Sequence, residues 1–263
     1  MALEKTQAVV LKAFNWSESS RTVLFFSERF GKLPLVDKGG RSFKSRRGRL
    51  QPFAQLEITF YSSQKESSGY LSDIDTQRVY SLDSEGSLGR LAYASAACEL
   101  LYLLLPEEEA QPELYRYFLT YLEKVEIADR RALPALFLSF FLRSMSLLGF
   151  HPSVSYCVVS GAEAAEIPLE NGKLLFSPKR GGLIAPACQK PGEYYIGLSA
   201  DQVKALSVLQ RASLDEAAGV PLGFEDATFL VETLGKFLRY HSGLVSDLKS
   251  LEFLQKLKNS LLS

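Results

Sequence analysis

The stretch Ala54-Gln55-Leu56-Glu57-Ile58-Thr59-Phe60-Tyr61 alternates apolar and polar side chains, which is the pattern of a strand with one buried face. Leu56, Ile58 and Phe60 share the face that should turn toward the core. Other β-rich runs flank this stretch at residues 7–14, 21–27, 31–37 and 70–75. Five short strands within about 75 residues suit a small closed barrel, because closure removes exposed strand edges. An SH3-like barrel is the competing arrangement of the same size.

A basic segment lies just before this stretch, between the third and fourth strands. It has no acid between Asp37 and Glu57, and it contains six cations: Lys38, Arg41, Lys44, Arg46, Arg47 and Arg49. Its glycines let the backbone turn and approach a partner closely, and Phe43 places an aromatic ring beside the charge. A cationic loop with an aromatic neighbour suits a polyanion with flat bases. A solvated basic loop without a ligand is the plainer alternative.

The chain as a whole carries no net charge, since its 263 residues include 30 Lys and Arg and 30 Asp and Glu. Its apolar fraction of 46% and charged fraction of 23% are those of a globular protein, and its length predicts two or three compact units. The chain has three cysteines, no secretory pattern at its N-terminus and no apolar run long enough for a bilayer. We therefore expect a cytoplasmic protein.

Apolar residues recur at every second position before about residue 85 and at every third or fourth position after it, which marks a change from strands to helices. Helices are predicted at about 88–105, 112–124, 131–148, 199–210, 226–241 and 246–262. The helix at 131–148 is apolar nearly all round and should lie in the middle of a bundle. Pro and Gly punctuate residues 150–197, where 174–176 and 182–184 could pair as short strands. The sequence thus predicts an α+β protein, with a barrel over 1–82 and a helical domain over 83–263 that includes an irregular insertion at 151–197.

A series of short motifs stands in order along most of the chain. It includes Ala8-Val9-Val10-Leu11-Lys12, Trp16-Ser17-Glu18-Ser19-Ser20-Arg21, Phe30-Gly31-Lys32-Leu33, Lys38-Gly39-Gly40-Arg41, Leu50-Gln51-Pro52-Phe53, Arg90-Leu91-Ala92-Tyr93-Ala94, Leu147-Leu148-Gly149-Phe150-His151-Pro152 and Phe176-Ser177-Pro178. In this order the motifs resemble the RecO family of bacterial recombination mediators, from about residue 6 to residue 190. The order carries the resemblance, since no single motif is specific.

The resemblance implies an N-terminal OB-fold, a helical C-terminal domain and an inserted zinc-ribbon-like element. It also implies binding of single- and double-stranded DNA and annealing of complementary strands. The implied partners are RecR and the C-terminal tail of single-stranded DNA-binding protein, with which the protein helps RecA to load. On this basis we expect a nucleoid-associated recombination mediator in DNA repair.

The inserted element departs from the family pattern of two Cys-x-x-Cys pairs. The first pair reads Cys157-Val158-Val159-Ser160 and the second reads Ala185-Pro186-Ala187-Cys188. A closed structural zinc site needs four nitrogen or sulfur ligands, and Ser160 is a poor ligand while Ala185 is none. We therefore expect no zinc or other cofactor, with Cys157 and Cys188 as remnants of the degenerate site that lie close together.

The expected DNA contacts come mainly from the basic segment. Cations would meet phosphates and release counterions, and aromatic rings would stack on bases. The residues are Lys38, Arg41, Lys44, Arg46, Arg47 and Arg49 for phosphates, Phe43 for stacking, and Arg21 on the first hairpin turn as an extension of the surface. For Phe43, packing onto the barrel is as good an expectation as stacking on a base. Three further phenylalanines are expected in the core: Phe14, Phe53 and Phe60.

No catalytic constellation is evident, because the two histidines are far apart and neither a P-loop nor a Gly-x-Ser-x-Gly elbow is present. We therefore expect no enzymatic activity. In the helical half, Arg130, Arg131 and Arg143 flank the Phe- and Leu-rich third helix and could line a groove for an acidic, apolar peptide such as the single-stranded DNA-binding protein tail. The alternative function is a protein-interaction scaffold whose basic loop contacts an acidic protein or RNA.

Overall fold

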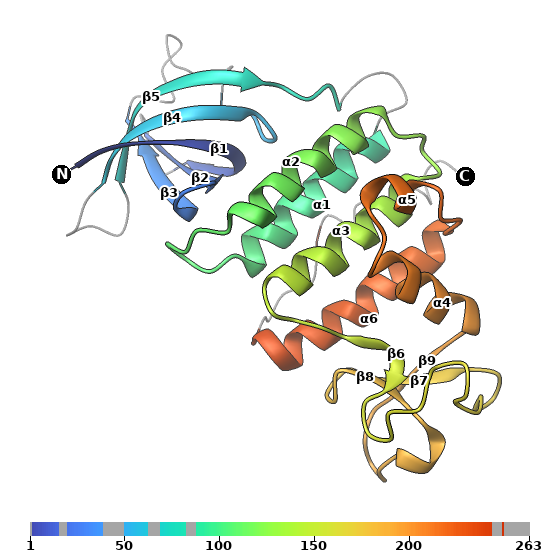
Figure 1. The fold of residues 1–263 in the computed structure, drawn as a ribbon. Coiled ribbons are helices and arrows are strands. Elements are labelled where there is room, and N and C mark those ends of the chain that lie inside the picture. The colour runs from blue at the N-terminus through green and yellow to red at the C-terminus, as the bar shows by residue number, and fades with distance from the viewer. Residues whose placement is uncertain are drawn as a thin grey trace. The chain divides into compact units, whose positions relative to one another are not determined.

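The computed structural model of the chain describes residues 2–15, 20–38, 50–62, 69–82, 88–243 and 249. The chain divides into two compact units, residues 1–127 and 128–263 (Figure 1). The first unit includes the two helices that follow the N-terminal strands. Our division after residue 82 follows the change from strands to helices, and it stays a prediction about independently folding domains. The helix predicted at 246–262 lies outside the described residues apart from Lys249.

Five strands form a closed barrel in the first unit: β1 (Ala2–Asn15), β2 (Arg21–Ser27), β3 (Gly31–Asp37), β4 (Gln55–Ser62) and β5 (Gly69–Arg78). Their order around the barrel is β1-β2-β3-β5-β4, and only the pairing of β3 with β5 is parallel. The neighbours β4-β1-β2-β3 make a Greek key, and a five-stranded Greek-key barrel is an OB-fold. The barrel and its OB-like fold are confirmed, and the SH3-like arrangement is not adopted.

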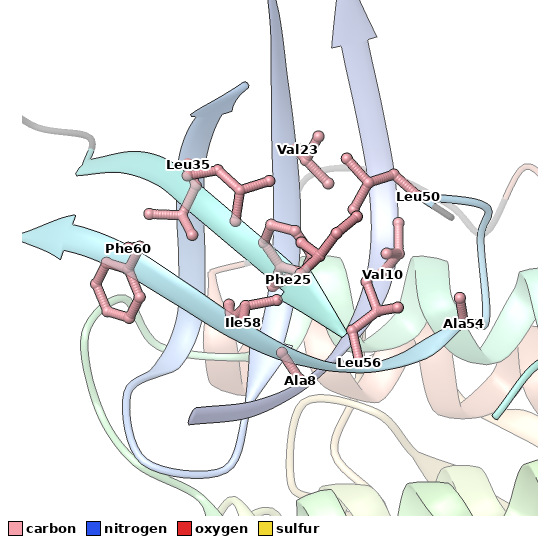
Figure 2. Close-up of a cluster of buried hydrophobic side chains, with 12 residues drawn as sticks. Ala8, Val10, Val23, Phe25, Leu35, Leu50, Ala54, Leu56, Ile58 and Phe60 are labelled. Atoms are coloured by element: carbon pink, nitrogen blue, oxygen red, sulfur yellow. The ribbon is translucent and has the colours of Figure 1, made fainter. Parts of the chain in front are cut away.

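The barrel core is built from alternate residues of each strand, as the side-chain period of two requires. Figure 2 shows these side chains turned toward one another: Ala8, Val10, Val23, Phe25, Leu35, Leu50, Ala54, Leu56, Ile58 and Phe60. The predicted inward face of β4 is confirmed, because Leu56, Ile58 and Phe60 are each at most 2% exposed. Phe53 is also buried, as expected. Phe14 was wrongly expected in the core, since it is 39% exposed.

Two helices, α1 (Leu88–Leu104) and α2 (Pro112–Ile127), pack against the outside of this barrel. On β2, Phe26 points outward and meets the ring of Tyr115 edge-on, with 5.4 Å between the ring centroids. On β3, the Lys32 ammonium group donates to the carbonyl oxygen of Tyr102 at 3.4 Å. The Tyr121 hydroxyl donates to the carbonyl oxygen of Tyr93 at 3.2 Å and so links the two helices. These contacts make the barrel and the α1–α2 hairpin one packed body.

The second unit is organised around α3 (Leu133–Leu147), of which only three residues are not buried. Helices α4 (Ala200–Leu209), α5 (Leu214–Ala218) and α6 (Phe224–Ser242) pack on it. Its predicted central position is therefore confirmed. Ser199 caps the N-terminus of α4: its side chain accepts from the Gln202 backbone N–H, while the Gln202 side chain accepts from the Ser199 N–H. This capping box fixes where α4 leaves the preceding strand.

The insertion forms a four-stranded sheet of order β6-β8-β7-β9, from β6 (Ser153–Cys157), β7 (Leu174–Ser177), β8 (Gly182–Ile184) and β9 (Ile196–Leu198). The two short strands predicted here are confirmed and pair antiparallel, with Phe176 opposite Leu183. A short 3-10 turn, η2 (Pro186–Cys188), follows β8. None of the helices within the described ranges is long and apolar enough to cross a membrane.

Candidate nucleic-acid interface

Several strand ends meet at one end of the barrel. The first residue of β2, Arg21, pairs with the last residue of β1, Asn15, and with the last residue of β3, Asp37. Near the start of β5, Tyr70 pairs with Val36 of β3 on one side and with Tyr61 of β4 on the other. The connections β1–β2, β3–β4 and β4–β5 therefore all start or finish at this end. OB-folds bind oligonucleotides with the face of their second and third strands and with the β1–β2 and β4–β5 loops. We call this the loop-bearing end.

The basic segment starts at the loop-bearing end with Lys38, which is exposed and directly follows β3. The chain returns to described structure at Leu50, which is buried in the barrel core. The other predicted contacts of this segment lie outside the described residues: Arg41, Phe43, Lys44, Arg46, Arg47 and Arg49. Their roles stay predictions.

Lys38 lies over an aromatic ring, with its ammonium nitrogen 3.9 Å from the centroid of Tyr70. This is a cation–π contact. Tyr70 stands opposite Tyr61 in the β4–β5 ladder, so both rings leave the outer face of the barrel. Tyr61 is 43% exposed. We call Lys38, Tyr61 and Tyr70 the aromatic–cationic face, and it combines the two groups that a single-stranded nucleic acid requires.

Sequence reasoning missed both tyrosines, although one signal was available. The alternation that turns Ile58 and Phe60 inward also turns Tyr61 outward. What the sequence lacked was the register of β4 against β5, which places Tyr70 beside Tyr61.

The outer face of β4 and β5 becomes acidic away from this end. Glu57 stands opposite Asp75, and Thr59 stands opposite Asp73. Lys5 on β1 approaches Glu57, with 2.6 Å between the ammonium nitrogen and a carboxylate oxygen. Like charges repel, so this acidic part of the face is less favourable for a polyanion than the tyrosine end.

Arg21 lies at the loop-bearing end but is not free to meet a phosphate. Its Nε donates to the Asp37 carboxylate at 3.1 Å, and the two residues are only 9% and 4% exposed. The pair joins the start of β2 to the end of β3, and Lys38 follows Asp37 in the chain. A charge that is buried and already compensated adds little to an outer binding surface. We therefore no longer count Arg21 among the DNA contacts.

A second group of cations and rings lies near the end of β1. The Lys12 ammonium nitrogen is 4.8 Å from the centroid of the Phe14 ring and 5.3 Å from that of Tyr102 on α1. Lys32 approaches the same Tyr102 ring at 5.7 Å. Helices α1 and α2 therefore cover part of the outer face of β1–β3.

Backbone hydrogen bonds hold Cys157, which we expect to be a remnant of a degenerate zinc site. The Cys157 sulfur accepts backbone N–H bonds from Ser160 at 3.4 Å and from Ala185 at 3.2 Å. These are the two positions at which the resemblance implies further cysteines. In the described part of the chain, no three His, Cys, Asp or Glu side chains stand together as a metal site would require. The residues present do not fit a closed structural zinc site.

A polar network links the neighbouring chain segments instead. Arg180 forms an ion pair with Glu193, with 2.7 Å between Nη2 and Oε2, and donates to the carbonyl oxygen of Cys188 at 3.2 Å. Tyr195 donates its hydroxyl proton to Glu193 at 2.7 Å and accepts from the Lys190 backbone N–H at 2.8 Å. The hydrogen bond from Tyr195, followed by that from Arg180, lowers the pKa of Glu193. The network thus ties the β7–β8 turn to residues 188–195.

We expect Cys157 to titrate near pH 6. Burial alone would raise its pKa, but hydrogen bonds from Ser160, Ala185 and Val159 outweigh burial and lower the pKa from 9.0 to about 6. The thiolate therefore stabilises the fold above pH 9, and this contribution is lost as the pH falls through 6. The measurement is a pH titration of thiolate ultraviolet absorbance, taken as the difference between the wild type and Cys157→Ser. A midpoint near the ordinary thiol value would contradict the expectation.

The three arginines predicted to line a peptide groove do not form one cluster. Arg130 and Arg131 lie together in the turn before α3, and all three side chains are exposed. Arg143 lies twelve residues beyond Arg131, which is roughly 18 Å along a helix. The structure therefore brings Arg130 and Arg131 together but not Arg143, and a groove at this place stays a prediction.

Comparison with known proteins covers nearly the whole chain. Residues 1–80 match the family model for Recombination protein O N terminal, and residues 85–252 match that for Recombination protein O C terminal. "DNA repair protein RecO" of Symbiobacterium thermophilum is 31% identical over 99% of this chain and 100% of its own length. The protein of the same name from Desulfatibacillum aliphaticivorans is 30% identical, over 96% of each chain. The chain therefore belongs to the RecO family of DNA repair proteins.

Proposed function

We propose that the protein binds single- and double-stranded DNA at the loop-bearing end of its barrel and anneals complementary strands. The observation that carries this proposal is the aromatic–cationic face, where Lys38 lies 3.9 Å from the ring centroid of Tyr70 beside the exposed Tyr61. The acidic outer face along Glu57, Asp73 and Asp75 supports the same location, because it repels DNA from the neighbouring surface.

The proposed mechanism needs no catalytic group. Cations of the basic segment neutralise two phosphate backbones, which would otherwise repel each other. Tyr61 and Tyr70 hold bases by their flat faces, so the edges that form Watson–Crick pairs stay free. Annealing is thus accelerated by bringing two strands together, and the protein acts as a mediator and not as an enzyme.

The partners belong to the same proposal and rest on family membership. We propose that the protein acts with RecR and with the tail of single-stranded DNA-binding protein, so that RecA can load on the exposed strand. This places its work in the cytoplasm, at the nucleoid. Sequence-specific recognition is not part of the proposal, since every contact invoked is to phosphates or to base faces.

The test is fluorescence anisotropy of a labelled single-stranded oligonucleotide over a salt series. Wild type is compared with a variant that carries alanine at Lys38, Arg41, Lys44 and Arg46. Each lost phosphate contact should lower the slope of log K against log salt by about 0.7. The matched control, Lys179→Ala with Lys190→Ala, removes exposed charge from the second unit and should bind as wild type does.

Equal binding by the wild type and the quadruple variant would place the DNA elsewhere. A wild-type protein that binds no DNA at low salt, but binds RNA or an acidic protein through the same cations, would favour the scaffold function instead.

We also propose that the insertion folds without zinc. The N–H bonds to Cys157 and the network of Arg180, Glu193 and Tyr195 do the linking that a metal does in a zinc ribbon. Purified protein should therefore contain well under one zinc per chain by elemental analysis. A zinc chelator should leave its melting temperature unchanged. Stoichiometric zinc, or a melting temperature that falls on chelation, would contradict this proposal.

A further inference from the structure

We propose that Arg21 and Asp37 are a positioning pair for the aromatic–cationic face: they hold the end of β3 so that Lys38 leaves it over the ring of Tyr70. The pair itself makes no contact with DNA, because both of its side chains are buried. Its effect on DNA binding rests on the proposed function, in which Lys38 meets a phosphate. Its effect on the position of Lys38 does not.

The pair lies on the inner face of the barrel, at the loop-bearing end. Side chains two residues apart on a strand share a face. On β2, Arg21 therefore shares the face of Val23. On β3, Asp37 shares that of Leu35, and both apolar residues belong to the barrel core (Figure 2). Arg21 and Asp37 are also ladder partners, with 3.1 Å between Nε and Oδ2. The ion pair thus continues the inner faces of both strands beyond the apolar core.

The same alternation decides where Lys38 points. With Asp37 turned inward, the next side chain turns outward, and Lys38 is exposed. Among the described residues, the ladder of β3 with β5 ends at Val36, which stands opposite Tyr70. The last residue of β3 is therefore fixed by its partner on β2. A slip of this end by one residue would turn Lys38 inward and remove it from Tyr70.

Stability alone is a poor explanation for an ion pair at this place. Replacing a buried ion pair by apolar residues of similar volume often leaves a protein equally or more stable. Here Nη2 of Arg21 is buried and has no hydrogen-bond partner among the residues that the structure describes. What the ion pair adds is direction, because an apolar pair can slide whereas the hydrogen bond from Nε to Oδ2 favours one register of the two strand ends.

Nuclear magnetic resonance of the full chain, labelled with ¹³C-lysine, tests the pair without DNA. The Lys38 signal is identified by its absence in Lys38→Arg. In the wild type, the ring current of Tyr70 should shift the side-chain protons of Lys38 upfield, and Tyr70→Leu should abolish this shift. Asp37→Ala should abolish it too. Asp37→Asn keeps an acceptor oxygen for Arg21 and should keep the shift.

The matched control is Glu28→Ala, which removes a carboxylate from the turn at the opposite end of β2 and β3, where it pairs with Arg116 at 3.5 Å. It should leave the Lys38 shift unchanged. The proposal is overturned if the wild type shows no shift, if Asp37→Ala keeps the shift, or if Glu28→Ala loses it as well. Should Asp37→Ala fail to fold, Arg21→Met with Asp37→Val removes the whole pair and takes its place in the test.

A double-mutant cycle then measures the consequence for DNA binding. In the wild type, Lys38→Ala should lower the slope of log K against log salt for a single-stranded oligonucleotide by about 0.7. In the Asp37→Ala background, where Lys38 is no longer held in place, the same substitution should lower it by less than about half as much. An equal loss in both backgrounds overturns the positioning role. No loss in the wild type would instead refute the DNA contact of Lys38, and the lysine spectra would still decide whether the pair positions it.

Discussion

Replacing Tyr61 and Tyr70 together by alanine is expected to weaken binding of a single-stranded oligonucleotide by about 2–6 kcal/mol, roughly 30-fold to 20,000-fold. Each ring that stacks on a base contributes about 1–3 kcal/mol, whatever the base. The two rings stand opposite each other on the outer face of β4 and β5. Lys38 lies over Tyr70 and is the phosphate contact that we propose beside them.

Anisotropy titrations at one fixed salt concentration measure this loss. The matched variant, Tyr61→Phe with Tyr70→Phe, keeps both rings and should bind within about threefold of the wild type. The salt slope of the alanine variant should stay that of the wild type, because no cation is removed. A slope that falls with the affinity would mean that the alanine variant has displaced Lys38, and equal affinity in all three proteins would remove the tyrosines from the interface.

The barrel could be predicted because its pattern is local. The alternation along residues 54–61 specifies both the strand β4 and its buried face. The apolar residues on nearly all sides of α3 specify a helix in the middle of a bundle. Both signals depend only on neighbouring residues. The parts that the sequence did not reveal depend on pairings across long separations. The ladder partners Tyr61 and Tyr70, the ion pair of Arg21 with Asp37, and the packing of α1 and α2 on the barrel are all of this kind.

Phe14 and Arg21 show how residue type misleads without register. A phenylalanine in a β-rich run suggested the core, yet Phe14 lies on the outer face beneath the Lys12 ammonium group. An arginine near a turn suggested a phosphate contact, yet Arg21 is buried against Asp37. In the insertion, by contrast, the sequence shows directly that Ser160 and Ala185 stand where the resemblance implies cysteines. The pairing of Arg180 with Glu193 needed three-dimensional structure because the two residues are thirteen positions apart.

Gly31→Ala is expected to lower the free energy of unfolding by about 3–5 kcal/mol, an effect at the severe end for a single substitution. Gly31 begins β3 with φ +64°, a left-handed conformation that costs a residue with a side chain about 1–2 kcal/mol. A Cβ atom here would also lie only 1.9 Å from the carbonyl oxygen of Glu109, in the loop between α1 and α2. Because that neighbour is backbone, the α1–α2 hairpin would have to move away from the barrel.

Chemical denaturation of the full chain measures the change, and Gly235→Ala provides the contrast. Gly235 lies within α6 with open space around it, so alanine there should stabilise by up to about 1 kcal/mol through helix propensity. Gly31 is at the opposite end of β3 from Lys38, roughly 20 Å away along the strand. Below its melting temperature the Gly31→Ala variant should therefore bind DNA as the wild type does. Normal stability with lost DNA binding would instead mean that the DNA site extends to the α1–α2 loop.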